Sequence, residues 1–407
     1  MRSKNIEYNE KLDHVRWFAA LFVILFHCLL LFESQGFLTR QQIYDCPFTR
    51  IASEGYTGVA LFMTLSGFLF ARICHDKHIS LWNFYRNRIL RIYPLFLFVL
   101  LMACSLDPLR NDFFSLLRSI FLMHNLKNAV FFPQFTEVLW TIPVEVQFYL
   151  LFPFLLIFYR KFGLRYLFLL IVLAVATKAA VYCFKGSVFM MAYTTIFGRI
   201  DQFVIGMILG FSFEKLAPYF KSPMTFLAVL ALTLFGLWYC VAPPGASDTT
   251  GSAWWIARNL IEGSAFGLLI LSYVATSFSM PSMLSRLVAF GGALSFSLYV
   301  DHFFILQSGE HLYIPIVYGQ HSHYPLLCQL ASWLQVNPMV SYLCFALLVE
   351  LPLAIVAAML TYFVIEKPFL SLRTGYIMEP VENPTLLVVP GAGDPQFDLS
   401  ETAAKLA

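Results

Sequence analysis

The stretch Trp17-Phe-Ala-Ala-Leu-Phe-Val-Ile-Leu-Phe-His27-Cys-Leu-Leu-Leu-Phe32 contains no Lys, Arg, Asp or Glu and a single imidazole, that of His27. A helix crosses the hydrocarbon core of a bilayer in about 20 residues, so this run with its flanks is long enough to cross. It leads into Glu33 and Ser34 without the small-residue cleavage site of a signal peptide. The sequence therefore predicts a first membrane helix here.

Similar apolar runs recur along the chain, which is 59% hydrophobic and only 13% charged. Soluble domains carry about 25% charged residues, so the composition excludes an ordinary soluble protein. The pattern predicts an all-α, polytopic membrane helix bundle of about ten transmembrane helices. Their expected centres lie near Ile24, Leu65, Phe98, Leu150, Val172, Ile205, Leu230, Leu269, Leu298 and Ile355.

The basic residues that flank these runs predict the orientation of the bundle. With the N-terminus inside, 17 Lys and Arg residues flank the spans on the cytoplasmic side and 7 on the outer side. The positive-inside rule then places both termini in the cytoplasm. We expect a membrane domain over residues 1–374 and a disordered cytoplasmic tail over residues 375–407, which is rich in Pro, Gly and acidic residues.

The net charge of +3 and the lack of a basic stretch interleaved with aromatic residues indicate no nucleic-acid partner. The eight cysteines show no CxxC spacing, so no zinc site is expected. A disulfide between Cys46 and Cys328, both in predicted outer loops, stays open. The His-x-His pair at His321 and His323 has no further ligand beside it that would complete a metal site.

Charged and titratable residues inside the spans are costly in a bilayer and are therefore candidates for function. Arg16 and His27 are eleven residues apart, which places them on one helix face with about 16 Å between them along the axis. Asp13 lies close to the same face. His27 is interpreted as a catalytic residue, the alternative being a hydrogen-bonded packing histidine.

Arg88 and Arg91, with Arg86 just before them, stand at the cytoplasmic entrance of the third span. Residues three apart are neighbours on a helix, so two guanidinium groups can converge on phosphate oxygens. The alternative is that these arginines only fix the topology of the span.

Trp140 begins a segment that carries Glu145 and Tyr149 one helical turn apart, close enough to hydrogen-bond. Glu145 either serves the reaction or pairs with a cation of another helix for structure alone. In the sixth span we expect Arg199 and Asp201 to pair with other helices. The spacing Gly206-x-x-x-Gly210 predicts close helix packing.

Tyr299 and His302 share a polar face in the ninth span with Ser295, since their spacing matches helical turns. Such a face lines a cavity or contacts another polar helix. In the last span, Tyr362 and Glu366 are four residues apart, and an ion pair capping the helix end is the favoured interpretation of Glu366.

Together these residues resemble the motifs of the acyltransferase family 3 membrane proteins, over about residues 8–373. Seven motifs occur in the expected order: Leu12-Asp13-x-x-Arg16 with His27, Leu65-Ser66-Gly67-Phe68, Arg88-x-x-Arg91-Ile-Tyr-Pro94, Trp140 to Tyr149, Arg199-x-Asp201, Phe296-Ser-Leu-Tyr-x-x-His302 and Tyr362-x-x-x-Glu366-x-Pro368.

The resemblance implies acyl-CoA as a cosubstrate, with no permanently bound cofactor, and a hydroxyl of a cell-envelope or exported polysaccharide as acceptor. The chain is expected in the bacterial cytoplasmic membrane as a multi-pass O-acetyltransferase. The expected roles are as follows: catalytic, His27, Arg16, Glu145 and His302; donor-binding, Arg88, Arg91 and Arg86; substrate-lining, Asp13, Ser66, Trp140, Tyr149, Asp201 and Tyr299.

Two alternatives remain at the level of sequence. The acceptor is a small secreted glycoside or metabolite, or the chain is a transporter or flippase, which also places charges at the membrane midplane. The acyl chain, the acceptor hydroxyl, the oligomeric state and the role of His27 as general base or acyl carrier stay open.

Overall fold

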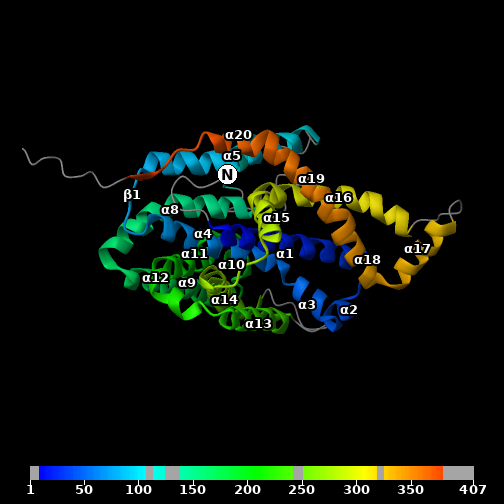
Figure 1. Cartoon of the computed structure of the whole chain (residues 1–407), viewed down its shortest axis with the longest axis horizontal. Coiled ribbons are helices and arrows are strands. Elements are labelled where there is room, and N and C mark those ends of the chain that lie inside the picture. The colour runs from blue at the N-terminus through cyan, green and yellow to red at the C-terminus, as the bar shows by residue number, and fades with distance from the viewer. Residues whose placement is uncertain (1–8, 107–112, 124–137, 242–250, 319–324, 379–407) are drawn as a thin grey trace, which may run out of the picture.

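A computed structural model describes residues 9–106, 113–123, 138–241, 251–318 and 325–378 of the chain. Almost all of these residues are helical, and the long helices lie along the long axis of the molecule (Figure 1). At one end lie β1 (His78–Ile79) and the short helix α12 (Phe213–Leu216); at the other lie α2 (Arg40–Asp45), α3 (Pro47–Ala52), α17 (Pro325–Val336) and α18 (Pro338–Cys344).

The first half of the chain contains α1 (Glu10–Ser34), η1 (Gly55–Thr57), α4 (Gly58–Cys74), α5 (Leu81–Leu106), α6 (Phe113–Ile120), α8 (Thr141–Phe162) and α9 (Leu164–Lys185). The second half contains α10 (Phe189–Thr194), α11 (Ile196–Phe211), η2 (Ala217–Phe220), α13 (Pro223–Cys240), α14 (Trp254–Ala275), α15 (Ser282–Ala293) and α16 (Ser295–Tyr318). The last described elements are one long helix and a strand. The helix is made of α18, η4 (Phe345–Glu350), α19 (Leu351–Thr361), η5 (Tyr362–Glu366) and α20 (Lys367–Ser371), and the strand is β2 (Ile377–Met378).

Seven described helices are long and apolar enough to cross a membrane, or up to nine if two bent helix pairs each count as one span. The two pairs are α11 with α12 and η2, bent by 64°, and α15 with α16, bent by 68°. Each of the ten expected centres lies in a helix, but α14 is not among the spans because Arg258, Asn259 and Glu262 lower its hydropathy. The structure thus supports a bundle of seven to nine spans, and the expected count of about ten is not confirmed.

The helices α4 and α11 pack closely at three glycines. A Cβ atom on Gly206 would lie 2.0 Å from the carbonyl oxygen of Thr64, and one on Gly67 would lie 2.0 Å from that of Phe203. A Cβ on Gly210 would lie 2.5 Å from the carbonyl oxygen of Phe68. The close packing expected from the Gly206-x-x-x-Gly210 spacing is confirmed. It fixes α4, which carries Ser66, against the centre of the bundle.

The segment after α20 returns along the start of α5. The strands β1 and β2 pair antiparallel, with His78 opposite Met378 and Ile79 opposite Ile377. Tyr376 is buried between them and the bundle. The described chain therefore continues to Met378, beyond the boundary expected at residue 374, while residues 379–407 of the expected tail lie outside the described part. The side chain of Cys328, and with it the open question of a disulfide to Cys46, also lies outside it.

Candidate active site

A cavity of about 600 Å³ lies between α1, α4, α5, α8, the junction of α15 with α16, and the segment after α20. It gathers residues that are far apart in sequence. Eight of the expected site residues line it: Asp13, Arg16, Ser66, Arg88, Arg91, Glu145, Tyr149 and Tyr299. Its lining includes Asn9, the first described residue, and Arg373, which follows α20. The part of the cavity next to these two residues is called its mouth.

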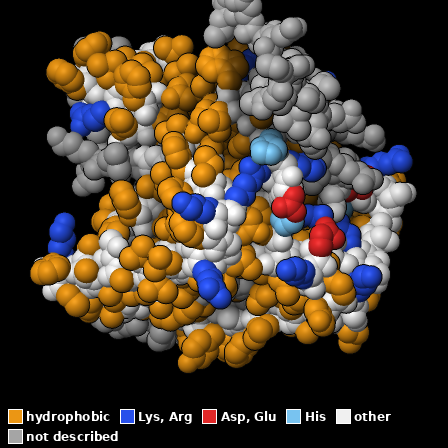
Figure 2. Space-filling model, turned by 90° about the vertical axis from the view of Figure 1, so that its left-hand side faces the viewer, with side chains coloured by type: hydrophobic (Ala, Val, Ile, Leu, Met, Phe, Trp, Pro, Cys, Tyr) orange, Lys and Arg blue, Asp and Glu red, His pale blue; other side chains and the backbone are white. Residues whose placement is uncertain are grey.

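Figure 2 views the molecule from the end where β1 lies, which is the left-hand side of Figure 1. Basic, acidic and histidine side chains gather on this face among apolar side chains. This end of the molecule thus carries a group of charged side chains within a largely apolar surface.

The wall formed by α1 depends on an ion pair within one helical turn. Arg16 donates to the carboxylate of Asp13 at 2.5 Å, and the Asp13 side chain is the more buried of the two. The neighbouring helix α15 packs directly on this turn, since a Cβ atom on Gly292 would lie 1.9 Å from the carbonyl oxygen of Asp13. The pair holds the guanidinium of Arg16 at the cavity wall.

The arginines of α5 have different surroundings. Arg91 forms an ion pair with Glu366 of η5, and Ser297 donates a hydrogen bond of 2.7 Å to the same buried carboxylate. The guanidinium of Arg88 lies over aromatic rings instead, 4.9 Å from the ring centre of Phe70 and 5.5 Å from that of Tyr149. Aromatic faces attract a guanidinium without neutralising its charge, so Arg88 can still bind an anion in the cavity.

Glu145 and Tyr149 face the same cavity from α8. The hydroxyl of Tyr149 donates to the carboxylate of Glu145, as the one-turn spacing predicts. The phenol orients the carboxylate and leaves its other lone pairs available.

The inner end of the cavity is closed by Phe62, Thr141 and Tyr299. The hydroxyl of Tyr299 donates to the carbonyl oxygen of Val138 at 2.6 Å and accepts from Thr141 at 2.9 Å. These two bonds fix the phenol of Tyr299 as the last polar group before the two histidines.

His27 and His302 form a pair directly beyond Tyr299. Their ring centres are 5.0 Å apart, and His302 Nε2 lies 3.2 Å from His27 Nδ1. The rings of Tyr299 and His302 are 5.7 Å apart. Within the described part of the chain, neither histidine lines the 600 Å³ cavity itself. The pair therefore stands behind the inner wall, one side chain away from the cavity.

The hydrogen bonds of this pair determine which nitrogen of His27 carries a lone pair. His302 Nδ1 lies 2.7 Å from the carbonyl oxygen of Tyr299, which can only accept, so this nitrogen carries the proton and Nε2 of a neutral His302 accepts. His27 Nδ1 faces that acceptor and the carbonyl oxygen of Val23 at 2.9 Å, so it also carries a proton. The lone pair of a neutral His27 is then on Nε2, the nitrogen that can take a proton or an acyl group.

Three expected site residues lie elsewhere. Asp201 does not line the cavity of the described residues: it is fully buried and accepts from Lys178 at 2.5 Å, which ties α11 to α9. Trp140 lies against Tyr193, with ring centres 4.7 Å apart, and under the guanidinium of Arg199. Arg86 lies half-buried on α5, outside the cavity lining that the structure describes. These three positions depend on how the helices pack against one another, which the spacing of residues along a single helix does not determine.

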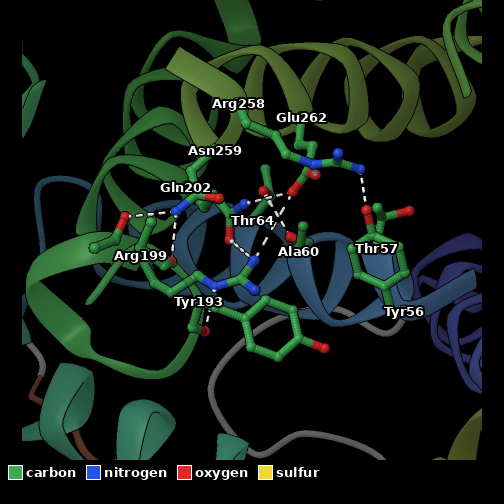
Figure 3. A network of polar contacts seen from close by, with 12 residues as sticks. Tyr56, Thr57, Ala60, Thr64, Tyr193, Arg199, Gln202, Arg258, Asn259 and Glu262 are labelled. Atoms are coloured by element: carbon green, nitrogen blue, oxygen red, sulfur yellow. Dashed lines mark hydrogen bonds and ion pairs between the residues drawn. The ribbon is translucent and has the colours of Figure 1, made fainter. Parts of the chain in front are cut away.

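A second polar network joins α11 and α14 to η1 and the residue before it (Figure 3). Arg258 donates to Glu262 at 2.7 Å and pairs with Glu54 at 2.5 Å, while Gln202 donates to Glu262 at 3.1 Å. Each buried charge thus has a partner of opposite sign, which is what a structural network in an apolar interior requires.

Several residues at or next to the cavity were not expected there from the sequence. Glu366 was expected in an ion pair that caps the helix end; the ion pair is present, and its partner is Arg91, which lines the cavity. Asn87, Arg286, Arg373 and Tyr376 line the cavity themselves. Their only sequence signal is a position near the cytoplasmic end of a predicted span. Among the described residues, no group of three or more His, Cys, Asp or Glu side chains could hold a metal ion, and His321 and His323 lie outside them.

Comparison with known proteins identifies the class. A family model described as an acyltransferase domain, that of acyltransferase family 3, matches residues 9–365. The chain is 26% identical to the acyltransferase MdmB of Streptomyces mycarofaciens over 74% of its own length and 80% of that protein. It is 23% identical to the O-acetyltransferase OatA of Staphylococcus aureus over 56% of its own length and only 38% of that protein.

No solved structure matches the chain. The family match spans nearly all of the described helices, and the curated relatives share the same class of activity. The chain belongs to acyltransferase family 3 and is a multi-pass membrane O-acyltransferase.

Proposed function

We propose that this enzyme moves an acyl group, most simply acetyl, from acyl-CoA to a hydroxyl group of a cell-envelope carbohydrate, in the bacterial cytoplasmic membrane. The observation that carries the proposal is the single cavity that has Arg88 and Arg91 near its mouth and Tyr299 at its inner end, against the His27–His302 pair. The positive-inside orientation would put the mouth in the cytoplasm, where acyl-CoA is found.

The charges of the cavity suit a donor that carries several phosphates. Five arginines line it, at positions 16, 88, 91, 286 and 373, against the three acids Glu10, Asp13 and Glu145. Guanidinium groups bind phosphate oxygens through paired, charge-assisted hydrogen bonds. A cavity of about 600 Å³ is in the range of small-molecule sites, so it can take the pantetheine arm with the phosphates at the mouth.

The chemistry needs one group that can move a proton between the acceptor and the donor sulfur. In one route, His27 Nε2 takes the hydroxyl proton while the acceptor oxygen bonds to the thioester carbonyl carbon. The carbon–sulfur bond then breaks, and the thiolate takes the proton from His27 and leaves as coenzyme A. In the other, His27 Nε2 bonds to the thioester carbonyl carbon while the carbon–sulfur bond breaks and coenzyme A leaves as the thiolate. The acceptor oxygen then bonds to the same carbon while the bond to Nε2 breaks, and the hydroxyl proton goes to the thiolate.

The choice of acetyl is supported by the similarity to OatA, which is an O-acetyltransferase. The chain spans less than half of the length of OatA, so the similarity concerns only that part of OatA. The carbohydrate acceptor rests on the resemblance of the motifs alone.

Replacing Arg88 with Gln should raise the KM for acetyl-CoA about tenfold to hundredfold, because a hydrogen bond to a charged group contributes about 1.5–3 kcal/mol. The matched control is Arg86→Gln, which removes the same charge two residues away and outside the described cavity lining. Release of free coenzyme A by the purified protein in detergent, with membrane carbohydrate as acceptor, measures both variants. Equal KM values for the two variants would remove the assignment of the donor to this cavity.

A further inference from the structure

The segment after the last helix, residues 372–378, is here called the C-terminal strap. It begins after the residues that the family model matches, 9–365. It is nevertheless bound to the bundle through two hydrogen bonds to one residue. Asn87 of α5 donates to the carbonyl oxygen of Thr374 at 2.6 Å and accepts from the backbone N–H of Thr374 at 3.1 Å. Side-chain bonds to both groups of one peptide position hold the strap in a fixed register.

Further contacts continue the attachment toward the end of the strap. Asn83 donates to the carbonyl oxygen of Gly375 at 3.2 Å. The backbone N–H of Ser80 donates to the carbonyl oxygen of Tyr376 at 2.8 Å. The Tyr376 ring is 1% exposed and packs edge-on against Phe84, with ring centres 5.4 Å apart. Ordering a chain segment costs conformational entropy, and these contacts offset that cost. The strap is thus an ordered part of the fold.

The strap forms one wall of the cavity mouth. Arg373, Thr374 and Tyr376 line the cavity, and the guanidinium of Arg88 lies 5.9 Å from the ring centre of Tyr376. The hydroxyl of Thr374 is buried and has no hydrogen-bond partner among the described residues. Buried hydroxyls are usually hydrogen-bonded, so Thr374 is a candidate to contact a group bound next to the strap.

The positive charge of Arg373 adds to that of Arg88 and Arg91. Burial, followed by the neighbouring guanidiniums of Arg91 and Arg88, lowers the pKa of Arg373 to about 10. Like charges gathered in a partly buried place repel one another, and a bound anion would remove this repulsion. Glu366 pairs with Arg91 and also acts on Arg373, but the cavity lining as a whole carries five arginines against three acids, and this excess of positive charge favours an anion beside Arg88 and Arg373.

Depth along the cavity suggests which phosphate this is. Arg91 lies one helical turn further into the bundle than Arg88, whereas Arg373 follows the end of α20 and lies outside the spanning helix. In coenzyme A, the group farthest along the molecule from the reacting thioester is the phosphomonoester on the ribose. A donor whose thioester faces Tyr299 therefore brings this phosphate to the strap.

We infer that the C-terminal strap is part of the donor site: Arg373 binds the ribose 3′-phosphate of acyl-CoA, and Asn87 positions Arg373 by holding the strap. The inference rests on the proposed function, since it takes acyl-CoA as the donor. It gives this part of the chain the role of selecting a donor that carries the phosphomonoester.

The test compares acetyl-CoA with acetyl-3′-dephospho-CoA as donors for the purified, full-length protein. For the unmodified enzyme, we expect a KM about tenfold or more lower for acetyl-CoA, the effect of one charge-assisted contact. Arg373→Gln should raise the KM for acetyl-CoA to the dephospho value and leave the dephospho value unchanged. Asn87→Ala, which alters no charge, should reduce the preference in the same direction. The control Lys367→Gln removes an exposed positive charge six residues before Arg373 and should preserve the preference.

The outcomes separate the two proposals. If Arg373→Gln and Asn87→Ala both keep the preference while Arg88→Gln weakens donor binding, the role of the strap is refuted and the proposed function stands. If Arg373→Gln does not fold, as judged by its elution in detergent, Asn87→Ala decides alone. If the unmodified enzyme uses neither thioester, the proposed function fails and the strap inference fails with it.

Discussion

Replacing His27 with Asn should lower kcat for acyl transfer by about 10²- to 10⁴-fold, the usual contribution of a positioned general acid–base group. Asn keeps a polar side chain of similar reach but has no nitrogen lone pair that can take a proton or an acyl group. The KM for acetyl-CoA should stay unchanged, because His27 lies behind the inner wall of the cavity and away from the arginines at its mouth. Coenzyme A release by the purified variant, and its acetyl-CoA titration, measure both quantities.

A matched variant at the partner histidine separates chemistry from positioning. His302→Asn leaves His27 in place but removes the acceptor nitrogen 3.2 Å from His27 Nδ1. We expect a smaller loss of kcat, because the contact with the carbonyl of Val23 at 2.9 Å still orients the ring. A His27→Asn protein that transfers acetyl at the unmodified rate would exclude His27 from the chemistry. Mass spectrometry of the unmodified enzyme with acetyl-CoA and no acceptor distinguishes the two routes, since only an acyl carrier gains mass.

Removing Glu366 should destabilise the protein strongly. Its carboxylate is 1% exposed and neutralises Arg91, so Glu366→Met leaves a partly buried guanidinium without its counter-charge. Breaking a buried ion pair costs about 3–5 kcal/mol, and we expect the lower end because the Arg91 side chain keeps 23% exposure toward the cavity. A lower midpoint of thermal unfolding in detergent, and less protein in the membrane, would follow.

The double variant Arg91→Met/Glu366→Met tests whether the pair serves stability, donor binding or both. Removing both charges together should restore most of the lost stability, since no unpaired charge remains. Donor binding by the double variant should be weaker than by the unmodified enzyme, because the cavity has lost one of its five arginines. A double variant as unstable as Glu366→Met alone would contradict an isolated pair and point to further partners of Glu366 besides Ser297.

Local relations could be predicted from the sequence because they depend only on helical spacing. The one-turn hydrogen bond between Tyr149 and Glu145 and the close packing at Gly206 and Gly210 were both predicted from residues four apart. The position of Asp13 near the face of Arg16 was predicted too, whereas the ion pair between them was not. The order of the seven motifs was sufficient to identify the family, which the comparison confirms.

Relations between helices could not be predicted, because spacing along one helix carries no information about its neighbours. Asp201 was expected both to pair with another helix and to line the substrate site. The pairing is confirmed, but spacing could not name its partner, Lys178 on α9, and the pair lies outside the described cavity lining. Glu366 was expected at a helix end, whereas a packed neighbour, α5, supplies its partner Arg91. The bend of 68° between α15 and α16 follows Gly291 and Gly292, but two glycines do not specify the angle that the chain takes in the bundle.

The central claim is that acyl-CoA binds at the arginine-lined mouth and that its acyl group is transferred, in a reaction that needs His27, to an acceptor on the far side. Sealed membrane vesicles of both orientations, supplied with membrane-impermeant acetyl-CoA labelled in its acetyl group, test it directly. Label should appear on carbohydrate inside the lumen of inside-out vesicles only, and His27→Asn should abolish it. Equal labelling by right-side-out vesicles, or labelling that persists in the His27→Asn protein, would contradict the account.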